Sequence, residues 1–100
     1  MVNYNVTIYA SKSNRKNAKT VCKTFSVWPF DNGYKQLFDN HFEVKQWIDR
    51  MKIDYPVFHV VAYMDNVCIS NWEQSYLSAY QAETKTIAIM NLFNCAVKNS

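Results

Sequence analysis

The sequence is poor in the residues that build the common catalytic and metal-binding motifs. Its single glycine, Gly33, excludes the glycine-rich loops that cradle phosphate groups. Its three cysteines, Cys22, Cys68 and Cys95, form no C-x-x-C pair, and neither H-x-x-x-H nor D-x-D spacing occurs. A zinc site needs about four nitrogen or sulfur donors held close together. We therefore expect no bound metal and no cofactor.

The cysteine count also bears on the cellular compartment. A secreted domain of this size typically carries an even number of closely spaced cysteines, and three cannot all pair within one chain. Residues 1–5 lack the charged and apolar blocks of a signal peptide. The most apolar stretch, 87–97, is interrupted by Asn91 and Asn94 and is too short to span a bilayer. We expect a reduced, soluble protein in the cytoplasm, that of the host cell if a phage encodes it.

The first thirty residues contain no aspartate or glutamate, and the first acidic residue of the chain is Asp31. The cations that precede it are Lys12, Arg15, Lys16, Lys19 and Lys23. The rest of the chain is slightly acidic, so the net charge of +3 is concentrated at one end. Such a clustered positive field indicates an anionic partner more strongly than the net charge does.

The N-terminal third has the pattern of a β-hairpin. Apolar side chains at every second position from Val2 to Ala10 predict a strand with one buried face. A second strand is predicted over 20–28, with Val21, Phe25 and Val27 on one side. Antiparallel pairing of these strands would place the cations of residues 12–19 at the hairpin tip.

An amphipathic helix is predicted after this hairpin. Asp31-Asn32-Gly33 is the strongest turn signal in the chain, and residues 34–39 are ambiguous between a loop and a short helical turn. Asn40 and Glu43 have the spacing of a capping box, which predicts a helix over 41–52. The apolar stripe of this helix consists of Val44, Trp47, Ile48 and Met51.

A second hairpin follows, with strands over 57–64 and 67–70 and a turn at Asp65-Asn66 that accepts positive φ. Its core face is expected to carry Phe58, Val60, Ala62 and Met64, opposed by Val67 and Ile69. Its other face is expected to carry His59, Val61, Tyr63, Cys68 and Ser70.

The C-terminal third is the most ambiguous. Asn71 is a candidate helix cap, and the buried stripe of its helix would be Trp72, Tyr76, Ala79 and Tyr80. Residues 84–97 permit a strand, but helix is favoured because one face would collect Ala88, Ile89, Leu92, Cys95 and Ala96. The predicted order is β-β-α-β-β-α. Residues 1–100 then form one α+β domain, a four-stranded antiparallel sheet with its helices packed on one face.

The basic hairpin is the first candidate binding site. The side chains of Lys12, Arg15, Lys16, Lys19 and Lys23, with aromatic residues nearby, suit contact with phosphates and stacking with bases. The alternative is a solvated tip whose lysines protect the edge of the sheet. In outline, a basic hairpin followed by an amphipathic helix resembles the small DNA-reading domains of phage integrases. That likeness is one of pattern, without a shared motif.

Two further surfaces are candidates for protein contacts. Trp28, Phe30, Tyr34 and Tyr55 are predicted at strand ends, turns and loops, where exposed aromatic side chains would form a protein-docking patch. The acids between Asp31 and Glu83 either mimic the phosphates of a nucleic acid or are ordinary solvated surface.

Catalysis is not predicted. His59 and Cys68 are expected on one sheet face, but pairing through the turn would place Cys68 opposite Tyr63. His59 is then two rungs away, roughly 13 Å at about 3.3 Å per residue, which is too far for a nucleophile and its base. His41 follows Asp39 without further ligands nearby in the sequence, so it predicts no metal site.

Two hypotheses follow. The first is a non-enzymatic intracellular inhibitor that occupies a surface of a nucleic-acid-processing complex, such as a phage- or mobile-element-encoded anti-CRISPR or antirestriction protein. The second is a DNA- or RNA-binding domain that uses the basic hairpin 12–23.

Overall fold

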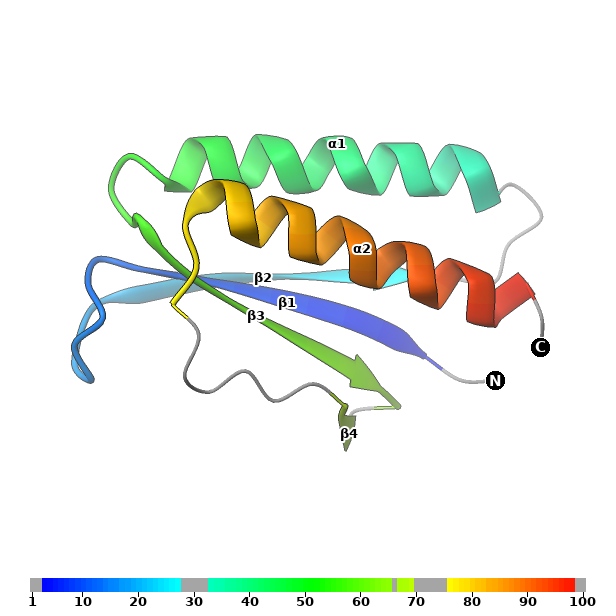
Figure 1. The fold of residues 1–100 in the computed structure, drawn as a ribbon, viewed down its shortest axis with the longest axis horizontal. Coiled ribbons are helices and arrows are strands. Elements are labelled where there is room, and N and C mark those ends of the chain that lie inside the picture. Colours follow the sequence, from blue (N-terminus) through cyan, green and yellow to red (C-terminus); the bar gives the residue numbers. More distant parts are fainter. Residues whose placement is uncertain (1–2, 28–32, 66, 70–75, 99–100) are drawn as a thin grey trace.

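The chain forms a four-stranded antiparallel sheet with two helices on one of its faces (Figure 1). The computed structural model describes residues 3–27, 33–65, 67–69 and 76–98. The elements in chain order are β1 (Tyr4–Ser11), β2 (Thr20–Val27), α1 (Gly33–Met51), β3 (Val57–Met64), β4 (Val67–Cys68) and α2 (Ala79–Lys98). The predicted α+β class, the element order and the antiparallel sheet are confirmed.

The sheet has the strand order β2-β1-β3-β4, so β1 and β3 are its central strands. Ile8 of β1 lies between Lys23 of β2 and Val60 of β3, and the next residue, Tyr9, lies between Cys22 and His59. Because successive side chains of a strand point to opposite faces, these two rows belong to opposite faces of the sheet. The Ile8 row faces the helices.

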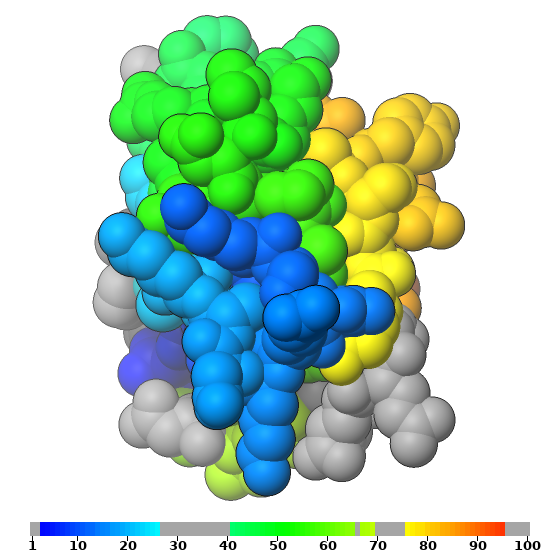
Figure 2. All heavy atoms as spheres, turned by 90° about the vertical axis from the view of Figure 1, so that its left-hand side faces the viewer, coloured from blue at the N-terminus to red at the C-terminus, as the bar shows by residue number. Residues whose placement is uncertain are grey.

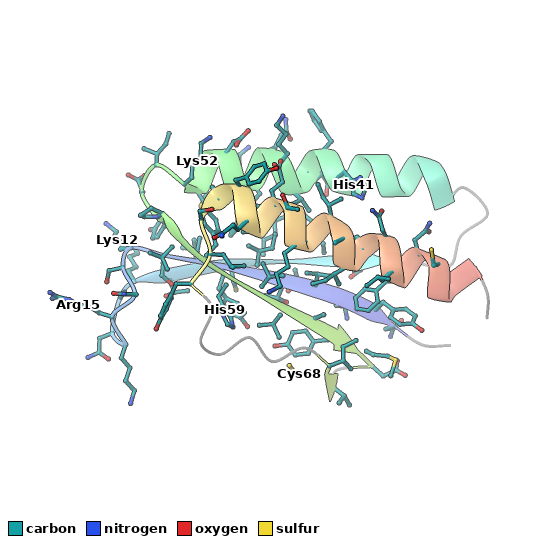
Figure 3. The ribbon with its side chains drawn as sticks, in the orientation of Figure 1. Lys12, Arg15, His41, Lys52, His59 and Cys68 are labelled. Atoms are coloured by element: carbon teal, nitrogen blue, oxygen red, sulfur yellow. The ribbon has the colours of Figure 1, made fainter. Side chains whose placement is uncertain are left out.

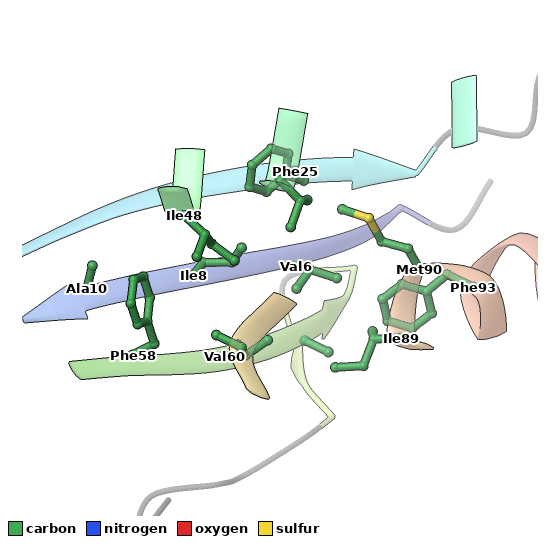
Figure 4. Close-up of a cluster of buried hydrophobic side chains, with 13 residues drawn as sticks. Val6, Ile8, Ala10, Phe25, Ile48, Phe58, Val60, Ile89, Met90 and Phe93 are labelled. Atoms are coloured by element: carbon green, nitrogen blue, oxygen red, sulfur yellow. The ribbon is translucent and has the colours of Figure 1, made fainter. Parts of the chain in front are cut away.

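The core lies between the sheet and the helices, where Ile48 of α1 lies near Ile8 and Phe25 (Figure 4). The buried strand residues are Val6, Ile8, Ala10, Phe25, Phe58, Val60 and Ala62. These positions confirm the predicted core faces of β1 and β3. The alternation of apolar and polar residues determines which side chains are buried, because only one face of each strand packs against the helices.

The predicted core positions at the end of the second hairpin are wrong. Met64, Val67 and Ile69 are all exposed. The reason is that β4 contains only two residues and lies at the edge of the sheet, beyond β3 and away from the helices (Figure 1). The turn itself is as predicted at Asp65, whose φ of 50° is a conformation that Asp tolerates better than most residues.

Helix α1 begins earlier than predicted, at Gly33 instead of residue 41. Asn40 is therefore an interior helix residue, and its predicted role as a cap is wrong. No proline or further glycine occurs between residues 34 and 51, so nothing in the sequence ends the helix there. The predicted stripe is confirmed, with Val44 and Ile48 fully buried and Trp47 and Met51 packed at the border of the core.

Helix α2 begins at Ala79. The helix expected after the candidate cap Asn71 does not include residues 76–78, which precede α2. Ser78 and Gln81 form a reciprocal cap: the Gln81 amide donates to Ser78 Oγ at 3.2 Å, and the Ser78 amide donates to Gln81 Oε1 at 3.0 Å. Leu77 precedes the cap as an extended residue and forms a β-bridge with Phe58. Asn71 and Trp72 lie outside the described residues.

The helix predicted over 84–97 is confirmed, but of its predicted buried face only Ile89 is found buried among the described side chains. From the stripe predicted after Asn71, the exposed residues are Tyr76 and Tyr80. From the stripe predicted for 84–97, they are Ala88, Leu92 and Cys95. The buried side chains are Ala82, Thr86, Ile89, Met90, Phe93 and Asn94, while the side chain of Ala96 is outside the described set. The small side chains of Ala82 and Thr86 let the helix approach its neighbours closely. A search for large apolar residues in the sequence does not identify these positions as buried.

Candidate binding surface

Among the residues that the structure describes, the face of the sheet opposite the helices carries no aspartate, glutamate, lysine or arginine. Its side chains alternate with those of the core and are Asn5, Thr7, Tyr9, Ser11, Thr20, Cys22, Thr24, Ser26, Val57, His59, Val61, Tyr63 and Cys68. We call this set the open face, because both helices lie on the other side of the sheet (Figure 1). It offers hydroxyl groups, aromatic rings and an amide, with no aspartate, glutamate, lysine or arginine.

A hollow of about 280 Å³ lies on the open face. It is lined by Asn5, Thr7, Tyr9, Cys22, Thr24 and Tyr63, which come from β1, β2 and β3. Thr7 is its most buried member, and the Thr7 and Thr24 hydroxyl groups form a hydrogen bond of 2.8 Å across the strands. Ser26 Oγ donates to Asn5 Oδ1 at 2.7 Å, which fixes the Asn5 side chain at the margin of the hollow.

The two tyrosines of the hollow, Tyr9 and Tyr63, interact through their side chains. A hydrogen bond between the side chains of Tyr9 and Tyr63, with a smaller contribution from burial, raises the pKa of Tyr9 above its ordinary value. Its phenol is therefore neutral at physiological pH. The ring of His59, which lies opposite Tyr9 on β3, is 6.4 Å from the Tyr9 ring, centroid to centroid. Tyr9 thus interacts with two β3 residues of the open face, Tyr63 through a side-chain hydrogen bond and His59 through a ring contact.

The β1–β2 connection, residues 12–19, forms an ordered tip at one end of the sheet (Figure 2). The Lys12 amide donates to the Lys19 carbonyl at 3.1 Å, and the Ala18 amide donates to the Arg15 carbonyl at 3.1 Å. At its base the Ser11 and Thr20 hydroxyl groups form a hydrogen bond of 2.8 Å. The backbone bonds within the tip give its main chain a defined course at the end of the open face.

Four of the five predicted cations lie on this tip, and all four are exposed: Lys12, Arg15, Lys16 and Lys19. Arg15 points away from the sheet (Figure 3). Lys12 Nζ lies 5.8 Å from the centre of the Tyr55 ring, a cation–π contact at the helix side of the tip. We call these four residues the cationic tip.

Lys23 is separate from the cationic tip. It lies on β2 opposite Ile8, on the helix side of the sheet, with its Nζ 5.6 Å from the centre of the Phe25 ring. A lysine that points to the core side of an edge strand discourages the addition of a further strand. In the sequence, its position in the charge run groups Lys23 with the tip, although the alternation that puts Val21 and Phe25 on one side of the strand also places Lys23 on that side.

No carboxylate pairs with the cationic tip among the residues that the structure describes. The ion pair found between described side chains is Lys52–Asp49, at 3.2 Å on the surface of α1. The positive charge of the tip is therefore available to a ligand from solution.

Of the predicted aromatic docking patch, the structure describes the side chain of Tyr55. Tyr55 is half-buried and packs against the core. Trp28 and Phe30 lie outside the described residues, and Tyr34 lies in the first turn of α1 with its side chain outside the described set. The docking patch stays a prediction.

The register of β3 agrees with the spacing that argued against a cysteine nucleophile. Cys68 lies opposite Tyr63, and His59 lies opposite Tyr9, two rungs further along the sheet. Cys22, Cys68 and Cys95 are exposed and form no disulfide bond. Within residues 3–27, 33–65, 67–69 and 76–98, no group of three His, Cys, Asp or Glu side chains is arranged to hold a metal ion.

His41 lies between the helices and is half-buried. Burial lowers the pKa of its imidazole, and a hydrogen bond with Asn91 of α2 partly opposes this effect. His41 Nε2 is buried without a hydrogen-bond partner. The residue thus belongs to the helix–helix contact and not to the open face.

Sequence reasoning found only part of the open face. His59, Tyr63 and Cys68 were placed together by the alternation of the second hairpin, whereas the contribution of β1 and β2 was missed. The pairing of β1 with β3 joins residues 46 to 60 positions apart, and no local pattern specifies it. The alternation of polar side chains from Asn5 to Tyr9 was the signal that could have indicated a second exposed row.

Neither helix, as far as it is described, is long and apolar enough to cross a membrane. No protein-family model matches the chain, and no curated protein or solved structure is significantly similar to it.

Proposed function

We propose that this protein is a non-enzymatic nucleic-acid-binding domain that contacts phosphate groups through the cationic tip. The observation that carries the proposal is the position of Lys12, Arg15, Lys16 and Lys19 at the end of an uncharged, aromatic sheet face, without carboxylate partners among the described residues.

Physical chemistry favours a polyanion at this surface. Each lysine or arginine that neutralises a phosphate releases counterions from the nucleic acid, which makes association favourable at low salt. The backbone hydrogen bonds of the tip order its main chain before binding, so less backbone conformational entropy is lost on association. The open face beside the tip carries no negative charge that would repel the rest of the polymer.

The inhibitor hypothesis has weaker support from the geometry. It depends on Trp28, Phe30, Tyr34 and Tyr55, and only Tyr55 has a described side chain, which is half-buried. The cations of the tip are all described and all exposed. For this reason the nucleic-acid interpretation, which the sequence ranked second, is the one that we place first.

The proposal is tested by comparing two variants with the same change of charge. Arg15→Ala/Lys16→Ala removes one arginine and one lysine from the cationic tip. Lys45→Ala/Arg50→Ala removes the same residue types from the exposed surface of α1. Binding to fluorescent oligonucleotides, single-stranded and duplex, is measured by anisotropy at low salt.

We expect the tip variant to bind about tenfold more weakly than the wild type, and the α1 variant to bind nearly as well as the wild type. Absence of nucleic-acid binding by the wild-type protein at low salt would overturn the proposal. An equal loss in both variants would also overturn it, because it would mean that net charge alone governs the interaction.

A further inference from the structure

We infer that the hollow on the open face is a subsite for one unpaired nucleobase, so that the protein selects single strands over duplexes. This inference rests on the proposed function and adds the class of substrate. The cationic tip connects β1 and β2, two of the three strands that line the hollow: Lys12 directly follows the end of β1 and is three residues from Tyr9, about 10 Å for an extended chain.

The lining of the hollow suits a base. A base has two flat π-faces and an edge of hydrogen-bond donors and acceptors, and aromatic side chains bind such faces by stacking. Tyr9 and Tyr63 supply the rings, while Thr24 and Asn5 supply polar groups beside them. The neutral Tyr9 phenol adds no charge that would oppose a neutral base.

The same lining disfavours other ligands. None of the six residues is charged, so the hollow itself offers no counter-ion to a phosphate group or to a charged metabolite. It is also broadly open to solvent, whereas sites for free small molecules bury most of their ligand. A base that belongs to a strand needs less enclosure, because the phosphates on the cationic tip hold it at a high effective concentration.

Selection for single strands follows from geometry. A base inside a duplex is stacked on both faces and paired along its edge, so it reaches a surface subsite only after unstacking and unpairing, at a cost of a few kcal/mol. A base in a single strand is already accessible. The tip would contact the phosphates of either form, so discrimination between them belongs to the hollow.

The first experiment compares binding of three ligands of equal length: a single strand of about ten nucleotides, its duplex, and an abasic strand that keeps the sugar–phosphate chain. We expect the wild type to bind the single strand about tenfold more tightly than the abasic strand. Tyr63→Ala should reduce this preference, and Tyr63→Phe, which retains the ring, should keep most of it. Tyr80→Ala, which removes an exposed tyrosine from α2, is the matched control and should leave the preference unchanged.

A second readout uses the native thiol of Cys22 and requires no substitution in the hollow. Cys22 lines the hollow and is exposed, and the other two cysteines can be replaced in a Cys68→Ser/Cys95→Ser background. The normal single strand should slow alkylation of Cys22 several-fold more than the abasic strand does at equal occupancy.

The outcomes separate this inference from the proposed function. Equal affinity for normal and abasic strands, with both still dependent on Arg15 and Lys16, would overturn the base subsite and leave the phosphate contact standing. Equal protection of Cys22 by both strands would also overturn the subsite. If no strand binds at all, both proposals are wrong, and capture of a protein by the tip becomes the explanation of its charge.

Discussion

The Thr7 and Thr24 hydroxyl groups lie 2.8 Å apart across β1 and β2, and this hydrogen bond forms the floor of the hollow on the open face. Thr7 is 6% exposed, so its hydroxyl group has little access to water when its partner is absent. The pair therefore contributes to stability as well as to the shape of the surface.

Thr24→Val is expected to lower the free energy of unfolding by about 1 kcal/mol, because it leaves the Thr7 hydroxyl group without its partner. The double variant Thr7→Val/Thr24→Val should lose less than the sum of the two single variants, since neither side chain then carries an unpaired polar group. Urea unfolding of the four proteins checks this. Additive losses would show that the two hydroxyl groups are not coupled.

Thr86→Val is expected to stabilise the protein by about 1 kcal/mol. The Thr86 side chain is fully buried in the core under α2, and its hydroxyl group has no hydrogen-bond partner. Valine has nearly the same shape and removes the unpaired group. Thr84→Val, at an exposed position of the same helix, is the control and should change stability very little. A destabilised Thr86→Val protein in thermal or urea unfolding would contradict the structural assignment.

Stability is expected to fall as the pH drops below about 6.5, because of His41. Burial lowers the pKa of His41 in the folded protein, so the unfolded chain takes up a proton at a higher pH than the folded protein does. The contribution is fully present above the pKa of the unfolded chain and is lost as the pH falls toward the lowered pKa of the folded state.

Urea unfolding at about pH 7.5 and about pH 5 measures this dependence. His41→Gln should weaken it. The same pH dependence in His41→Gln and in the wild type would assign the effect to other groups.

The sequence predicted those parts of the fold that depend on local periodicity. Apolar residues at every second position specify the core face of β1, and the 3.6-residue period specifies the buried stripe of α1. Both patterns hold because one side of each element meets the core while the other meets solvent.

The errors come from features that local patterns do not determine. The start of α2 depends on the cap formed by Ser78 and Gln81, and Asn71 offered a competing cap signal of the same kind. The buried face of α2 includes Thr86, a polar residue that a search for apolar stripes passes over. The helix was predicted correctly, but its orientation about its own axis was not.

The candidate site was predicted only in part, for a similar reason. The charge run of residues 12–19 is contiguous in sequence and was visible at once, and antiparallel pairing placed it at a hairpin tip. The hollow combines Asn5, Cys22 and Tyr63 from three strands, and their proximity exists only after β1 pairs with both β2 and β3. Long-range register of this kind cannot be read from one sequence.

The measurement that tests the central claim most directly is the salt dependence of affinity for a single strand of about ten nucleotides. If the four cations of the tip each neutralise one phosphate, the logarithm of the association constant should fall with the logarithm of salt concentration with a slope of about −3. In Arg15→Ala/Lys16→Ala the slope should become shallower by about 1.4, and in Lys45→Ala/Arg50→Ala it should not change. A wild-type affinity that is insensitive to salt, or a slope that the tip variant leaves unaltered, would contradict the assignment of phosphate contact to the cationic tip.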